Sequence, residues 1–115
     1  MAHIPQIKVR LGIAGVIANV YSWRSADRTS PVQIDLVIDR NDRIINLCEL
    51  KYSTSAFALD KEYAEHLNTR RQRFIDETGT HSAAHQTMIT THGLVHNAYA
   101  NDIQSQVTLD DLFSV

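Results

Sequence analysis

The sequence predicts an α/β domain in which helices cover a central mixed sheet. Three features support this class: an apolar hairpin at residues 33–52, a capped amphipathic helix at 61–77 and an apolar strand at 85–91. A strand, a helix and a further strand in this order form a crossover that packs the helix on one face of a sheet. Together with the N-terminal segments, the predicted order is helix, three strands, helix, strand.

The N-terminal segment favours a short helix over residues 4–11. Pro5 suits a first helical turn, Ile4, Ile7 and Leu11 form one apolar stripe, and Gly12 ends the helix. Residues 16–23 lose this spacing and gain β-branched and aromatic side chains, which indicates a first strand. One long helix over residues 4–23 remains the alternative. We interpret the polar segment 24–31 as a plain connector, although it is long enough to line a site.

Residues 33–40 and 44–52 are rich in Ile, Val and Leu and are separated by a polar turn at 41–43. This pattern predicts a β-hairpin. If the turn is centred on its middle residue, Val37 faces Leu47 across the antiparallel pair. The register of the hairpin therefore follows from its turn.

The same register places Asp35 opposite Glu49, with Lys51 on the same face because strand side chains alternate. Like charges directly opposite each other destabilise a sheet, and a divalent cation would remove that cost. Mg²⁺ is a hard ion that takes one or two carboxylates and keeps several waters. The Lys51 ammonium could hold or help to deprotonate a metal-bound water, or neutralise a phosphate. Asp35, Glu49 and Lys51 are thus the candidate catalytic residues.

The second half of the chain adds a helix, a strand and a final short element to the predicted fold. Asp60 is a good N-cap for a helix that runs to about Glu77, and Gly79 is a good stop signal. Residues 85–91 form the next strand, and residues 108–113 form a last strand or a short helix. A sheet covered on both faces is apolar on both sides. The side chains expected in the core are Ile34, Leu36, Val37, Ile38, Leu47, Leu50 and Met88.

Asp35 is followed, after thirteen intervening residues, by Glu49-Leu50-Lys51. This spacing resembles the signature of the PD-(D/E)XK nuclease superfamily, which has the restriction-endonuclease-like fold. The chain is most similar to the C-terminal nuclease-like domain of predicted prokaryotic AAA-type ATPases. Segments fitting that pattern in order are 3–8, 11–13, 22–23, 33–36, 39–40 with Asp42, 45–53, 90–94 and 109–113.

This resemblance implies a single nuclease-like domain over residues 1–115, as a C-terminal fragment of a longer ATPase. It implies hydrolysis of DNA phosphodiesters with Mg²⁺ (or Mn²⁺) held by Asp35, Glu49 and the backbone carbonyl of Leu50. Many superfamily members carry a further acidic ligand on the first helix, where this chain offers Gln6 or His3. Implied partners are DNA, the ATPase domain of the same protein and a second copy of the chain.

A second function stays open, because a nuclease fold can be kept without catalysis. The domain would then be a silent module for dimerisation or for docking to the ATPase. An exposed apolar patch would favour this alternative. A polar groove with Asp35, Glu49 and Lys51 at its floor would favour the enzyme.

Composition sets the outer limits. A chain of 115 residues that is 43% hydrophobic suits one globular domain. The lone Cys48 makes no disulfide within the chain, which fits the reducing cytoplasm. Its side chain is expected to point from an apolar strand into the core, which disfavours a role as a nucleophile. The apolar run 11–20 is too short to span a membrane. A zinc site is disfavoured, because the pair His81 and His85 falls across a helix end and a strand start, and His92 and His96 lack a partner cysteine.

The net charge of −2 disfavours autonomous DNA binding, since phosphate contacts dominate nucleic-acid affinity. Arginines cluster at residues 24 and 28 and again at 70, 71 and 73. We interpret both clusters as solvated surface charge.

Overall fold

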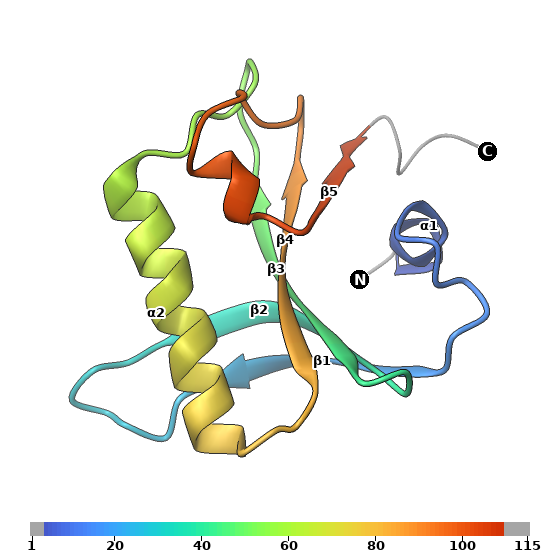
Figure 1. Cartoon of the computed structure of the whole chain (residues 1–115), viewed down its shortest axis with the longest axis vertical. Helices are drawn as coiled ribbons and strands as arrows, with labels where there is room; N and C mark the ends of the chain where they lie inside the picture. Colours follow the sequence, from blue (N-terminus) through green and yellow to red (C-terminus); the bar gives the residue numbers. More distant parts are fainter. Residues whose placement is uncertain (1–3, 110–115) are drawn as a thin grey trace.

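The computed structural model describes residues 4–109 and contains one five-stranded sheet with two α-helices (Figure 1). In chain order the elements are α1 (Ile4–Arg10), β1 (Ala18–Arg24), β2 (Gln33–Arg40), β3 (Ile44–Lys51), α2 (Lys61–Thr78), β4 (Ala83–Thr90), the 3₁₀ turn η1 (Ala100–Asp102) and β5 (Ser105–Thr108). The predicted order of helix, three strands, helix and strand is confirmed. The alternative of one long N-terminal helix is wrong.

The strands lie in the order β1-β2-β3-β4-β5. The first three form an antiparallel meander, whereas β4 is parallel to β3 and β5 is parallel to β4. Parallel neighbours need a crossover connection, and α2 provides it between β3 and β4. The last strand, β5, begins before the segment 108–113 that the sequence marked, and residues 110–113 lie outside the described part of the chain.

The two helices cover opposite faces of the sheet. Ile7 of α1 packs in a cluster with Leu36 and Cys48, which we call the α1-side core. Phe74 of α2 packs with Val37 and Leu47 in the α2-side core. Because neighbouring residues of β2 and β3 enter different clusters, the strands are buried on both faces, as the apolar runs predicted.

Six of the seven predicted core side chains are buried, and Leu50 is half-buried against the α1-side core. A third cluster, of Leu59, Leu67 and Met88, lies beneath η1 and the N-terminal half of α2. The core therefore extends along the whole of α2.

The hairpin register is confirmed over four pairs, from Leu36 with Cys48 to Asp39 with Ile45, and it includes Val37 with Leu47. The turn places Arg43 at a φ of 68°, the left-handed conformation that tight hairpin turns require. Arg40 bridges the turn through an ion pair of 2.5 Å to Asp42.

Both ends of α2 are capped as predicted. The Asp60 carboxylate accepts a hydrogen bond of 2.8 Å from the Tyr63 backbone N–H, which satisfies one of the free donors at the helix start. Gly79 has a φ of 64°, and its N–H donates to the Ile75 carbonyl. A glycine adopts this left-handed stop conformation without strain.

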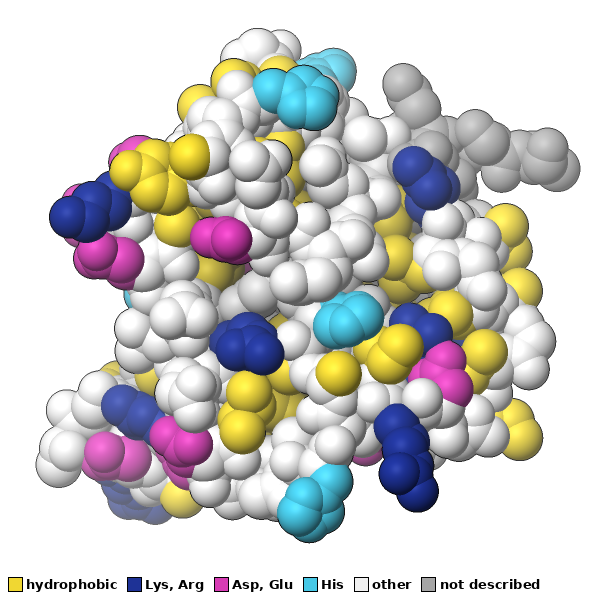
Figure 2. Space-filling view, viewed as in Figure 1, with side chains coloured by type: hydrophobic (Ala, Val, Ile, Leu, Met, Phe, Trp, Pro, Cys, Tyr) yellow, Lys and Arg dark blue, Asp and Glu magenta, His cyan; other side chains and the backbone are white. Residues whose placement is uncertain are grey.

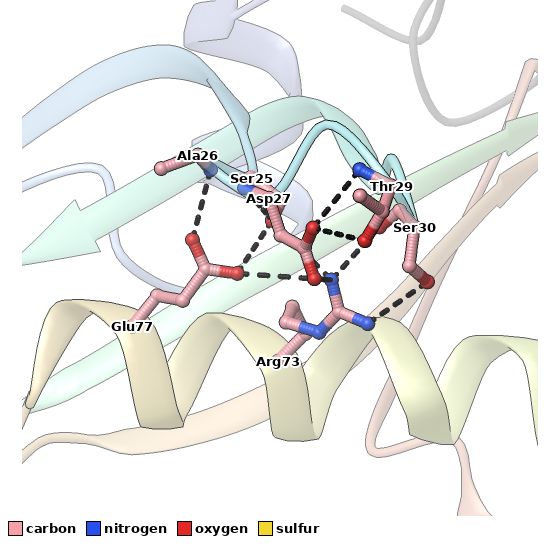
Figure 3. A network of polar contacts seen from close by, with 7 residues as sticks. All are labelled: Ser25, Ala26, Asp27, Thr29, Ser30, Arg73 and Glu77. Carbon is pink, nitrogen blue, oxygen red and sulfur yellow. Dashed lines mark hydrogen bonds and ion pairs between the residues drawn. The ribbon is translucent and has the colours of Figure 1, made fainter.

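The connector between β1 and β2 is fastened to α2 (Figure 3). Ser25 Oγ donates to Glu77 Oε2 at 2.5 Å, and the Ala26 N–H donates to Glu77 Oε1 at 2.9 Å. Arg73 donates to the Ser30 carbonyl at 2.8 Å and to its hydroxyl at 3.1 Å. The connector is therefore anchored at both ends, beyond the plain link that its composition suggested.

Replacing Glu77 with Ala should lower the free energy of unfolding by about 1–2 kcal/mol, because the buried Ser25 hydroxyl and the Ala26 N–H lose their acceptor. Urea denaturation measures the free energy of unfolding. Hydrogen exchange at the Ala26 amide should be faster in the variant than in the parent. Asp76→Ala is the matched control, since this carboxylate bonds only to the exposed Gln72 among the described residues. Equal losses of stability in the two variants would contradict the role of Glu77 in anchoring the connector.

Candidate functional site

Glu49 and Lys51 lie at the carboxyl end of β3 on the face that α2 covers. Their neighbours Cys48 and Leu50 pack into the α1-side core, so the alternation of the strand turns Glu49 and Lys51 toward α2. The structure therefore brings these two predicted residues to one face.

Glu49 is bound by two side chains of α2. Tyr63 Oη and Arg70 Nη1 each donate to Glu49 Oε2 at 2.8 Å. The Arg70 and Glu49 side chains are only 12% and 16% exposed, so the ion pair is largely shielded from water. Arg70 Nη2 also donates to the backbone carbonyl of Gln33. One guanidinium thus joins α2, β3 and the start of β2.

Lys51 lies against aromatic rings. Its Nζ is 5.4 Å from the centre of the Phe57 ring and 6.0 Å from that of Tyr63. The two rings meet edge to face, with centres 5.1 Å apart. Cation–π attraction holds the ammonium beside Tyr63, which in turn donates to Glu49.

Asp35 has different surroundings. Its side chain is exposed, and its Oδ1 accepts a hydrogen bond of 2.9 Å from Gln33 Nε2. The Gln33 amide oxygen in turn accepts from Arg24 Nη2 at 3.2 Å. Gln33 and Asp35 flank Ile34, whose side chain lies in the α2-side core. Gln33 and Asp35 therefore lie on the opposite face of the strand.

A β-bulge explains this orientation. The pairs that flank it are Tyr21 with Val37 and Trp23 with Ile34. Two residues of β2, Asp35 and Leu36, consequently face one residue of β1. Ile34 and Val37, three positions apart, both enter the α2-side core, which regular alternation would not allow.

The predicted side-by-side placement of Asp35 and Glu49 is therefore wrong for this structure. The regular pairing of β2 with β3 ends at Leu36 and Cys48, one pair short of Asp35 and Glu49, and the bulge turns Asp35 away from α2. The sequence-based prediction assumes unbroken alternation of side chains along β2. It also missed Tyr63 and Arg70, although two residues separated by two helical turns lie on one face of a helix.

The Mg²⁺ (or Mn²⁺) site that the resemblance implies is not assembled in this conformation. Glu49 supplies one carboxylate oxygen outside its contacts with α2, but Asp35 lies on the other face. Among residues 4–109, no group of three or more His, Cys, Asp or Glu side chains could hold a metal ion. The residues as placed do not fit a metal site built on two carboxylates.

The two candidates for an accessory ligand do not complete the site. Gln6 lies on α1, which covers the face opposite Glu49, and its buried Oε1 has no hydrogen-bond partner among the described residues. His3 lies outside the described residues.

The interpretation of the α2 arginines as solvated charge is wrong. Arg70 binds Glu49, Arg71 Nε donates to the Ala84 carbonyl at 2.9 Å, and Arg73 anchors the β1–β2 connector. On the face shown in Figure 2, lysine and arginine side chains are scattered among acidic ones. That face presents no continuous basic area of the kind that phosphate binding favours.

A large cavity lies elsewhere among the described residues. It has a volume of about 620 Å³ and opens between α2 and η1. Its lining includes Leu67, Arg71, Gln86, Tyr99 and Gln104 but neither Glu49 nor Lys51. The predicted site residues therefore do not form the floor of this cavity.

Burial, and the hydrogen bond to Glu49, raise the pKa of Tyr63 above its usual value of 10.0. In the unfolded chain the phenol ionises near its usual pKa while the folded state keeps its proton. The free energy of unfolding should therefore fall as the pH rises above 10. Urea titrations at a series of pH values should show a smaller fall in Tyr63→Phe. A difference between the two proteins that does not change with pH would contradict this prediction.

Burial raises the pKa of the Cys48 thiol to about 12. Because the thiolate is the reactive form, iodoacetamide should modify the native protein at pH 8 far more slowly than the urea-unfolded chain. Mass spectrometry over time measures both rates. Rapid labelling of the folded protein would show that Cys48 is accessible.

Comparisons of the chain with models of protein families, with curated proteins and with solved structures find no match. Within residues 4–109, neither helix has the length and apolar character that crossing a membrane requires.

Proposed function

We propose that the chain is a metal-dependent, nuclease-type domain of restriction-endonuclease-like fold that hydrolyses phosphodiester bonds in DNA, seen here in a resting conformation. The order of helix, antiparallel meander, crossover helix and parallel strand supports the fold assignment. The resemblance of the Asp35, Glu49 and Lys51 spacing supports the activity.

One observation carries the proposal: Glu49 and Lys51 share a face where the β2–β3 pairing stops, and Asp35 lies in a bulge at that point. Bulges occur next to active sites, where they re-aim a side chain. Because strand side chains alternate, a shift of the bulge by one position would turn Asp35 toward Glu49. The proposal assigns Asp35, Glu49 and the Leu50 carbonyl to Mg²⁺ (or Mn²⁺), with Lys51 beside them.

The second candidate is a catalytically silent module for dimerisation or for docking to an AAA-type ATPase. The neutralisation of Glu49 by Arg70 favours it, because that carboxylate already has a cation. Docking would also use exposed apolar side chains, and two of the most exposed are Val9 of α1, at 65%, and Ile17 just before β1, at 75%.

Replacement of Glu49 and Lys51 separates the two candidates. If the domain is a nuclease, Glu49→Ala should abolish metal binding and cleavage together, because a site with few protein ligands cannot lose one. Lys51→Met should retain metal binding, whereas cleavage should fall by about 10²–10⁴-fold, as for a lost acid–base group. Calorimetric titration with Mn²⁺ and nicking of plasmid and single-stranded DNA measure the two properties.

The same assays contain their own control. Equal cleavage by the parent and both variants would reveal a contaminating nuclease and remove the assignment. A parent that cleaves nothing, alone or with an ATPase partner if one exists, would favour the silent module.

A further inference from the structure

We propose that the cavity between α2 and the segment 97–104 binds a short extended peptide with free ends. Arg71 would hold the peptide carboxylate, and Glu65 and Asp102 would hold the peptide ammonium. We call this cavity the α2 groove. The proposal goes beyond the proposed nuclease function and is independent of it, because the candidate nuclease residues do not line the groove.

The size and the lining of the α2 groove suit a small organic ligand. Its volume of about 620 Å³ lies within the range of about 300–1,000 Å³ that is typical of ligand pockets. Leu59, Leu67 and Ile103 form an apolar part of the lining: the two leucines are buried, and Ile103 packs against their cluster. The other lining residues are mostly polar or charged. A ligand with an apolar centre and charged ends therefore matches the groove.

Hydrogen bonds fix the segment 97–104 at both ends. Near the start of α2, Asn97 Nδ2 donates to the Leu59 carbonyl at 3.0 Å, and Asn97 Oδ1 accepts from the Ala100 N–H at 2.9 Å. At the other end, the Gln104 N–H donates to the Gln86 carbonyl of β4 at 3.1 Å, and Gln104 Oε1 accepts from the Gln86 N–H at 2.7 Å. The wall is thus formed before a ligand binds, which lowers the entropic cost of binding.

One end of the α2 groove has unused hydrogen-bond donors. Arg71 Nε donates to the Ala84 carbonyl at 2.9 Å, which orients the guanidinium, but its two terminal nitrogens have no partner among residues 4–109. Gln104 Nε2 has no partner in the same part of the chain, since this amide is engaged through Oε1. A planar guanidinium binds a carboxylate through two parallel hydrogen bonds. This end therefore suits the carboxyl terminus of a peptide.

The part of the groove near η1 and the N-terminal half of α2 is acidic (Figure 1). Within residues 4–109 Asp102 makes no ion pair, and Glu65 pairs only with Lys61, at 3.9 Å. The Lys61 and Glu65 side chains are 76% and 68% exposed, so their pair is weak. Two carboxylates and one ammonium leave a net negative charge, which attracts a ligand ammonium and repels a polyanion such as a nucleotide.

The separation of the charges sets the length of the ligand. Glu65 and Arg71 lie six positions apart on α2, and a helix rises 1.5 Å per residue, so they are about 9 Å apart along its axis. An extended peptide advances about 3.3 Å per residue. About three residues therefore join the two ends, with the middle side chain against the apolar lining.

The experiment is a calorimetric titration of the whole chain with the tripeptide Ala-Leu-Ala, which has both ends free. We expect a Kd of about 1 mM or below. The same peptide with an amidated carboxyl end, or with an acetylated amino end, should bind at least about tenfold more weakly, because each loses a charge-assisted interaction. In NMR spectra of the parent, the free peptide should shift the amide signals of Leu67, Gln86 and Ile103.

Substitutions match each end of the peptide to its partner. Arg71→Met should weaken binding of the free peptide about tenfold and should remove the effect of amidation, since the carboxylate has already lost its cation. Asp102→Asn should reduce the effect of acetylation in the same way. Arg28→Met is the matched control for net charge: this exposed arginine lies in the β1–β2 connector and outside the groove, so the variant should bind as the parent does.

Several outcomes would overturn the inference. These are no binding of the free peptide up to about 10 mM, equal binding of the amidated peptide, an equal loss in Arg28→Met, or signal shifts confined to residues outside the groove. If Arg71→Met does not fold, Asp102→Asn and the two blocked peptides carry the test. The metal and DNA assays of Glu49→Ala report on the nuclease proposal alone, so either proposal can fail while the other stands.

Discussion

The ion pair between Glu49 and Arg70 holds together the end of the sheet on which the candidate site depends. Through this pair α2 contacts β3, and through the second guanidinium nitrogen it contacts the start of β2. A shielded carboxylate without its cation would be costly, so loss of either partner affects the fold as well as the site. Arg70 therefore links the stability of the fold to the geometry around Glu49.

The bulge in β2 is the second constraint, and it acts on Asp35. One extra residue opposite β1 lets Ile34 join Val37 in the α2-side core, which buries an isoleucine beside Phe74. The same extra residue directs Asp35 to the other face, where Gln33 binds it. Packing of Ile34 thus places Asp35 on the face opposite the one that the proposed metal site would require. This conflict is what a resting and a working conformation of the strand would have to resolve.

Sequence reasoning succeeded where the controlling interactions are local. The hairpin register follows from a three-residue turn, and the limits of α2 follow from Asp60 and Gly79, each of which bonds within its own helix. It failed where the interaction joins distant segments. The bulge depends on how Ile34 packs against α2, and the partner of Arg70 depends on where a helix crosses a strand. Neither is encoded in the spacing of Asp35, Glu49 and Lys51, and the metal roles of these residues remain predictions.

The arginines of α2 show how the fold uses charge that a nucleic-acid-binding domain would present to phosphates. Arg70, Arg71 and Arg73 lie almost consecutively, yet they bind a β3 carboxylate, a β4 carbonyl and the β1–β2 connector. Each guanidinium holds a different part of the chain against one helix. With a net charge of −2 and these cations engaged internally, counterion release offers little affinity for DNA. If the domain acts on DNA as proposed, cations other than these three arginines must provide the attraction for the phosphates.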